Sequence, residues 1–310
     1  MVEAGAGEDA FLPDDLERVP KWGEMHRQSG ARSFDAAVDV RRAPDAPWIA
    51  CRPMRSPPAP LVAIGADGAR GGWATALLYA DARRRGDAGV WQTRLALVAD
   101  VTELAGIRAQ ARGAATVAID IPIGLLDSVD FRPCDLAARG RLKRRASAVF
   151  APPARYMLPA AGDYGAIRAL VEDERKTTPA AKGLSAQAAG ITMKIREVDE
   201  WVRANPGSER WLFECHPELS FLALNDGTAL SAHKHCAAGL IQRLGLVRAE
   251  FPDVEEQLAA APWTAKQAEL SDLLDAYAAL STALVCARGE HEELGGGERD
   301  SEGLLMRMAL

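Results

Sequence analysis

The sequence predicts an α/β protein in which a mixed five-stranded sheet is flanked by helices, with a helical insertion between strands four and five. Three observations predict this class. Short apolar runs that stop at glycine, proline or acidic residues predict strands. Hairpin-length links join the first three runs, and a helical segment separates the third from the fourth. Because parallel strands need such a crossover, the first and fourth strands should lie side by side and parallel.

The predicted strands, in chain order, are Leu61–Ile64, Trp73–Tyr79, Trp91–Val98, Thr116–Asp120 and Trp211–Cys215. The link Arg70-Gly71-Gly72 suits a tight hairpin, because glycine adopts positive φ without steric cost. Pro122 and Gly124 end the fourth strand. A closing edge strand is expected at Leu304–Ala309.

The predicted helices are Val101–Arg112, Arg132–Arg144, Gly162–Asp173, Gln187–Ala204, Cys236–Glu250 and Thr264–Arg288. Asp100 is the expected N-cap of the first of these. Residues 125–209 form the helical insertion, within a folded region of residues 61–310. Residues 1–60 are rich in proline and charge and lack a sustained apolar period, so we expect an N-terminal extension outside the main core.

Composition limits the classes of function. A chain of 310 residues with 48% hydrophobic residues can bury a sizeable core. Its five cysteines are scattered and form no Cys-x-x-Cys pair, which argues against a disulfide framework and a zinc site and favours the cytoplasm. The sequence has no run of 18 or more uncharged apolar residues, so we expect no membrane span. The net charge of −6 disfavours a general nucleic-acid coat protein, but not an enzyme with a local basic channel.

Three carboxylates end apolar strands: Asp67, Asp120 and Glu214. The carboxyl ends of adjacent parallel strands meet at one rim of a sheet, where α/β proteins place their ligands. A buried carboxylate also requires a cation or a hydrogen-bond donor beside it. The alternative for Asp67, which precedes a glycine, is a turn aspartate that bonds its own backbone.

Two further acids, Asp272 and Asp275, share one face of the last long helix, since they are three residues apart. Asp275 is the expected inward residue, because the small side chains of Ala276, Ala279 and Ala283 follow it. Alternatively, Asp272 favours the helix dipole and Asp275 is solvated. Carboxylates with few histidines suit the hard cations Mg²⁺ or Mn²⁺, and two such ions can support phosphodiester hydrolysis.

Several motifs make the chain recognisable over residues 61–310; they are Gly65–Trp73, Asp120–Leu125, Cys134–Asp135, Arg145–Phe150, Lys194–Asp199 and Glu214–Glu218. In these motifs and their order the chain resembles a bacterial and archaeal family of unknown function whose members are described as predicted RNase H-like nucleases. The resemblance implies an RNase H-like fold. It also implies that Asp67, Asp120, Glu214 and Asp275 form a catalytic carboxylate metal site.

Candidate substrate-binding residues lie nearby in the motifs and their surroundings: Arg70, Arg145, Ser147, Lys182, Lys194 and His216. Arg145 and Ser147 belong to a basic segment that suits phosphate contacts, although a solvated helix face is the alternative. Lys182 precedes a helix start that could hold an anion, or that Ser185 simply caps. Lys194 points to the cleft or to solvent. His216 shares a strand face with Glu214 and is either functional or structural.

We therefore expect a nuclease that depends on a divalent metal and takes DNA or RNA as its substrate. A phosphotransferase or ATPase of the sugar-kinase and actin-like type, acting on a small metabolite, is the rival interpretation. A non-catalytic binding module is the third. The sequence leaves the oligomeric state open, a homodimer included.

Overall fold

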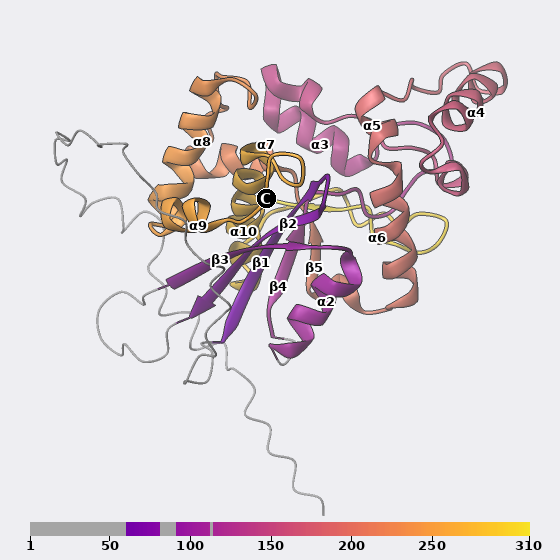
Figure 1. Cartoon of the computed structure of the whole chain (residues 1–310). Coiled ribbons are helices and arrows are strands. Elements are labelled where there is room, and N and C mark those ends of the chain that lie inside the picture. The colour runs from indigo at the N-terminus through magenta and orange to yellow at the C-terminus, as the bar shows by residue number, and fades with distance from the viewer. Residues whose placement is uncertain (1–59, 81–90, 112–113) are drawn as a thin grey trace, which may run out of the picture.

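The computed structural model describes residues 60–80, 91–111 and 114–310 (Figure 1). The predicted N-terminal extension, residues 1–60, lies outside these ranges except for Pro60. The carbonyl of Pro60 accepts a hydrogen bond from the N–H of Ala80 (3.0 Å), which brings the start of the described region to the sheet.

The central sheet has the strand order β3-β2-β1-β4-β5. Its strands are β1 (Leu61–Ala69), β2 (Gly72–Ala80), β3 (Trp91–Val98), β4 (Thr116–Ile119) and β5 (Leu212–Glu214). The first three pair antiparallel, whereas β1 with β4 and β4 with β5 pair parallel. The mixed five-stranded sheet is thus confirmed, with its first and fourth strands side by side and parallel.

Strand β1 is longer than predicted, because it continues through its glycines to the hairpin. Asp67 lies inside this extension, opposite Ala74 of β2. The turn between the strands is the predicted one, at Arg70 and Gly71. Gly72 opens β2 with φ of +133°, and a Cβ there would lie 2.0 Å from the carbonyl oxygen of Val98, so the position requires glycine.

The helices are α2 (Val101–Gln110), α3 (Pro133–Leu142), α4 (Tyr164–Thr177), α5 (Ala186–Gly190), α6 (Thr192–Ala204), α7 (Pro217–Leu224), α8 (Ala237–Glu250), α9 (Val254–Ala260) and α10 (Leu270–Ala287). Short 3₁₀ segments are Lys143–Ala148, Arg155–Ala160 and Ser208–Arg210. Helix α10 packs on one face of the sheet together with α7, α8 and α9, and α2 and α6 cover the other face (Figure 1).

The predicted helical insertion between β4 and β5 is confirmed, with shifted boundaries. The helix predicted at Arg132–Arg144 ends at Leu142, because Lys143 adopts a φ of 49° that interrupts the helix. The helix predicted at Gln187–Ala204 is divided at Ile191 into α5 and α6. The predicted N-cap of α2 is confirmed, since Asp100 accepts a hydrogen bond from the N–H of Glu103. Arg112, the predicted end of that helix, lies outside the described residues.

The prediction of a closing edge strand at Leu304–Ala309 is wrong. Only Met308–Ala309 forms a strand (β7), which pairs with Glu293–Leu294 (β6) in a separate two-stranded sheet, and Leu305 makes an isolated bridge with Arg299. Met306 and Met308 turn their side chains into a core shared with α3 and α7, so the apolar residues of this segment have another partner.

Helix α10 is long and apolar enough to cross a membrane by length and composition, but 72% of it is buried inside the protein. It lies against β1, β2 and β4 at the centre of the largest hydrophobic cluster. Its apolar character is therefore that of a core helix.

The packing of α10 on β1 depends on Gly65. A Cβ at this position would lie 2.0 Å from the backbone nitrogen of Leu280 and 2.2 Å from the carbonyl oxygen of Ala276. Backbone atoms cannot move aside as the end of a flexible side chain does. The predicted small residues of this helix, Ala276, Ala279 and Ala283, are fully buried and extend the same close contact.

We expect Gly65→Ala to destabilise the protein by about 1–3 kcal/mol, because the added methyl group must push α10 away from the sheet. Gly106→Ala on α2 is the matched control, since a Cβ there meets nothing within 4 Å and should raise helix stability slightly. Urea denaturation of both variants checks the prediction. Equal stability of Gly65→Ala and wild type would contradict it.

Candidate functional site

All five predicted acids line one cleft of about 580 Å³: Glu214, whose carboxylate is bound by Arg132, and four others, Asp67, Asp120, Asp272 and Asp275. Asp67 comes from β1, and Asp120 directly follows β4, where its N–H donates to the carbonyl of Ala66 (2.9 Å). This bond continues the β1–β4 pairing by one step, so both acids are fixed at the same end of the sheet. Helix α10 contributes the other two acids from its first turns.

Asp275 is the most buried of these acids, with 1% of its side chain exposed. Its Oδ2 accepts a hydrogen bond from Nζ of Lys234 (2.8 Å). Its Oδ1 is buried and has no hydrogen-bond partner. Burial raises the pKa of Asp275, with Lys234 opposing the shift. An unpartnered buried carboxylate oxygen at a cleft is costly, and it leaves a coordination position open.

Asp67 is buried as well, with 6% of the residue exposed. Burial and the neighbouring charges of Asp275 and Asp120 raise its pKa well above the ordinary value, against the opposing charge of Lys234. Carboxylates perturb each other in this way only when they lie close together in a medium of low polarity. The three acids therefore form one electrostatic group.

Lys234 supplies the positive charge of this group. It comes from the segment between α7 and α8 and also lines the cleft. Although burial opposes its charged form, Asp275, Asp67 and Asp120 together raise its pKa. The sequence analysis missed this lysine, since only the folded chain brings it to acids on other elements.

Asp272 both stabilises the start of α10 and lines the cleft, so both interpretations of this residue apply. Its Oδ2 accepts the N–H of Glu269 (2.9 Å) as part of a capping box at the start of α10, as the helix-dipole alternative requires. It also lines the cleft. One of its oxygens is thus committed to the helix start, which makes Asp272 a weaker candidate ligand than Asp275.

Glu214 occupies the predicted end of β5, but its carboxylate is already bound. Nη1 of Arg132 donates to Oε2 (2.8 Å) and Nη2 donates to Oε1 (2.5 Å), and the N–H of Ile123 adds a third bond to Oε2 (2.7 Å). Burial raises the pKa of Glu214 to about 7, with Arg132 opposing the shift. The structure therefore gives Glu214 a structural partner where we predicted a catalytic metal ligand.

Arg132 also binds Asp135, through Nη2 to Oδ1 (2.7 Å) and Nε to Oδ2 (3.0 Å). Ligand atoms of Cys134, Asp135 and Glu214 lie within 4.8 Å of one another, a spacing that could hold a metal. The guanidinium of Arg132 already hydrogen-bonds both oxygens of each carboxylate, and burial raises the pKa of the Cys134 thiol, which keeps it protonated. This cluster is a buried ion triad rather than a metal centre.

His216 has the structural role that the sequence left open. Its Nδ1 accepts the N–H of Glu218 (3.2 Å) as the N-cap of α7, and its Nε2 lies 3.3 Å from the carbonyl oxygen of Ala148. Both ring nitrogens are thereby engaged. The histidine lines the cleft and anchors the 3₁₀ segment Lys143–Ala148 to the start of α7.

Arg145, Ser147 and Lys194, three of the residues predicted to bind substrate, line the same cleft as the acids. Arg145 is bound to Glu218 (2.6 Å). Nζ of Lys194 donates to the carbonyl of Gly72 (2.5 Å) and lies 4.3 Å from the ring centre of Trp73. Burial lowers the pKa of Lys194, with Glu197 and Asp67 opposing the shift.

Two predicted substrate-binding residues lie away from the cleft lining. Arg70 is exposed at the β1–β2 hairpin and pairs with Glu269 (3.1 Å). Lys182 is exposed, and its backbone N–H donates to the carbonyl of Val129 (2.7 Å). The helix that follows Lys182 is capped by Ser185, whose hydroxyl accepts the N–H of Ala188 (3.0 Å). The capping alternative is therefore the one seen.

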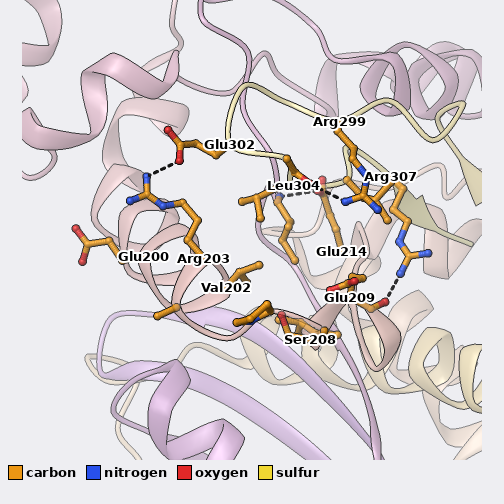
Figure 2. Close-up of a pocket in the computed structure, with 17 residues that line it drawn as sticks. Glu200, Val202, Arg203, Ser208, Glu209, Glu214, Arg299, Glu302, Leu304 and Arg307 are labelled. Carbon is orange, nitrogen blue, oxygen red and sulfur yellow. Dashed lines mark hydrogen bonds and ion pairs between the residues drawn. The ribbon is translucent and has the colours of Figure 1, made fainter.

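A second cavity, of about 630 Å³, lies beside the C-terminal part of α6 (Figure 2). Its arginines are engaged by the protein itself. Arg203 pairs with Glu302 (3.6 Å), Arg299 donates to the carbonyl of Gly303 (2.6 Å), and Arg307 donates to the carbonyl of Glu209 (Figure 2). These mutual contacts make the cavity a poorer candidate than the acidic cleft.

We expect Arg132→Met to destabilise the protein by about 3–5 kcal/mol, because it leaves the buried carboxylates of Glu214 and Asp135 uncompensated. Arg141→Met is the matched control: its pair with Glu292 is half exposed, so its loss should cost about 1 kcal/mol or less. Chemical denaturation distinguishes the two. A similar small cost for both variants would contradict the structural role of the triad.

We expect Asp67→Asn to stabilise the metal-free protein by about 1 kcal/mol or more at pH 7. The raised pKa means that the folded state holds this proton more tightly than the unfolded state, so wild-type stability falls as pH rises above about 4. Asparagine does not ionise, so the variant keeps its stability as pH rises. The difference in stability between the variant and wild type should therefore grow with pH. Thermal unfolding in a chelator from pH 4.5 to pH 8 tests this, with the exposed Glu256→Gln as control. A destabilised Asp67→Asn would refute the charge argument.

Comparison with known families identifies the chain, whereas comparison with curated proteins and with solved structures finds no match. The matching family model is described as "Protein of unknown function (DUF429)" and covers residues 65–299. This range includes every acid of the cleft. The chain therefore belongs to the DUF429 family of proteins of unknown function.

Proposed function

We propose that this protein is a divalent-metal-dependent nuclease with an RNase H-like fold that hydrolyses phosphodiester bonds in the acidic cleft. The observation that carries the proposal is the buried, unpartnered Oδ1 of Asp275 beside Asp67 and Asp120. The carboxylates of this group outnumber the cations that act on them, and a divalent cation is a partner that reduces this excess of negative charge.

The donor set fits Mg²⁺ or Mn²⁺. Asp67, Asp120 and Asp275 would hold the ion, with Asp272 nearby, and all of them offer oxygen atoms. Hard cations prefer oxygen ligands. When bound, such an ion activates water and stabilises the negative charge that develops on phosphate oxygens.

A part of the cleft wall formed by basic and hydroxyl side chains supports a phosphate-containing substrate. Arg144, Arg145 and Ser147 lie on the 3₁₀ segment Lys143–Ala148, which follows α3, and Lys194 of α6 lines the same cleft. Arginine and hydroxyl groups bind phosphate oxygens, while the buried acids exclude an anion from their own side until a cation is present. The substrate would thus lie with its phosphate between this wall and the acids. DNA or RNA as the substrate stays a prediction, and so does a cytoplasmic location.

We expect Asp275→Asn to lower cleavage at least about 100-fold, because it removes a ligand needed for charge stabilisation in the transition state. The assay uses labelled single-stranded, duplex, hybrid and branched nucleic acids and bis(p-nitrophenyl) phosphate, each with Mn²⁺ and with a chelator. Glu256→Gln, an exposed acid on α9, is the control and should cleave like wild type.

Three outcomes distinguish the interpretations. Cleavage that needs Mn²⁺ and Asp275 supports the nuclease. ATP turnover or stabilisation by ATP with Mg²⁺, without cleavage of any phosphodiester, would support the rival phosphotransferase. Equal cleavage by Asp275→Asn and wild type would refute the proposed site.

A further inference from the structure

Lys234 occupies the position in the acidic cleft where a cation is needed. Its ammonium lies 2.8 Å from Oδ2 of Asp275, and 31% of its side chain is exposed. The residues on either side, His233 and His235, are exposed at the same cleft. Lys234 is thus the residue of this segment that extends inward to the acids.

The charges around Lys234 do not balance. Asp67, Asp120 and Asp275 all act on the ammonium of Lys234, and Arg243 is a second positive charge that acts on Asp275, so three carboxylates face two positive charges. One oxygen of Asp275 is bound by Lys234, whereas the other is buried and unpartnered. The lysine therefore stabilises the acids only in part.

We propose that Lys234 is a built-in cation that holds Asp275 while the metal is absent and is displaced when a divalent ion binds. This inference rests on the proposed function and adds a regulatory step to the same site. An ammonium and a divalent cation repel each other strongly at contact distance in a poorly polar cleft, so Asp275 cannot hold both closely. The affinity for metal is then the difference between binding the ion and releasing the lysine.

The local structure allows the side chain to leave while its backbone stays. A Cβ at Gly239 would lie 2.0 Å from the carbonyl oxygen of His233, so the segment is packed tightly on the start of α8. The lysine stem, in contrast, is long, flexible and partly exposed. Displacement therefore requires only rotation of the Lys234 side chain toward the open side of the cleft.

The test compares the dissociation constant for Mn²⁺ of wild type and Lys234→Met, measured by titration calorimetry. Methionine keeps an unbranched side chain but removes the competing charge, so we expect Mn²⁺ to bind roughly tenfold more tightly. In a chelator the same variant should unfold at a lower temperature than wild type, because Asp275 loses its partner. Lys266→Met, which removes an exposed lysine outside the cleft, is the control and should change neither quantity.

A second measurement uses the wild-type protein and does not depend on the folding of a variant. The rate of acetylation of Lys234 by a small reagent, followed by mass spectrometry, should rise several-fold on addition of Mg²⁺. The rate for Lys266 should stay constant.

The outcomes separate this inference from the proposed function. Equal Mn²⁺ affinity of Lys234→Met and wild type, or an unchanged acetylation rate, would overturn the displacement of Lys234 and leave the nuclease proposal standing. Absence of Mn²⁺ binding in both proteins, under conditions where both are folded, would overturn the nuclease proposal and this inference together.

Discussion

The contact between the backbones of α10 and β1 at Gly65 is the constraint on which the site depends. No side chain separates the two elements there, because even a Cβ would meet the backbone of Ala276 and Leu280. The approach places the turn of α10 that carries Asp275 next to the strand ends that carry Asp67 and Asp120. Packing of the core and convergence of the acids thus have one cause, and a wider spacing of α10 would separate the carboxylates as well as loosen the core.

The protein treats its buried charges in two different ways. Arg132 lies between Glu214 and Asp135, and each carboxylate receives two guanidinium bonds, so no oxygen is left without a partner. At the cleft the only contact that binds Asp275 within the described residues is Lys234, and one oxygen stays unsatisfied. A saturated ion group stabilises a fold, whereas an unsaturated one leaves a buried polar atom that a ligand can satisfy.

Local signals made much of the fold predictable. The apolar run Trp91–Val98 and the cap at Asp100 were predicted at their observed positions, since both depend on residues within a few positions of each other. No helix is predicted over α7, although it directly follows the fifth strand and begins at Pro217, and proline is favourable at the first position of a helix.

The difference between local signals and long-range packing also explains which features of the candidate site could be predicted. Strand ends and helix spacing predicted which acids converge, because the sheet topology follows from the order of the elements. The cations that bind two of those acids are contributed from distant positions: Arg132 is 82 residues from Glu214, and Lys234 is 41 residues from Asp275. No local pattern specifies such pairs, since they depend on how loops and helices pack after the sheet has formed. The sequence therefore predicts the acids but not which of them stay open.

The charge of the cleft also orders the events of binding. The chain carries a net charge of −6, and the cations opposite the acids are partly neutralised, as Arg145 is by Glu218. A phosphate that approaches the acids before a metal meets carboxylates with one ammonium among them, and repulsion prevails. On the proposals above, a divalent ion would reduce the negative charge of the acids and, by releasing Lys234, would free one more cation in the cleft to contact the phosphate. If the proposed function holds, loading of the ion precedes and strengthens binding of the substrate, which would couple the two ligands through the charge of one lysine.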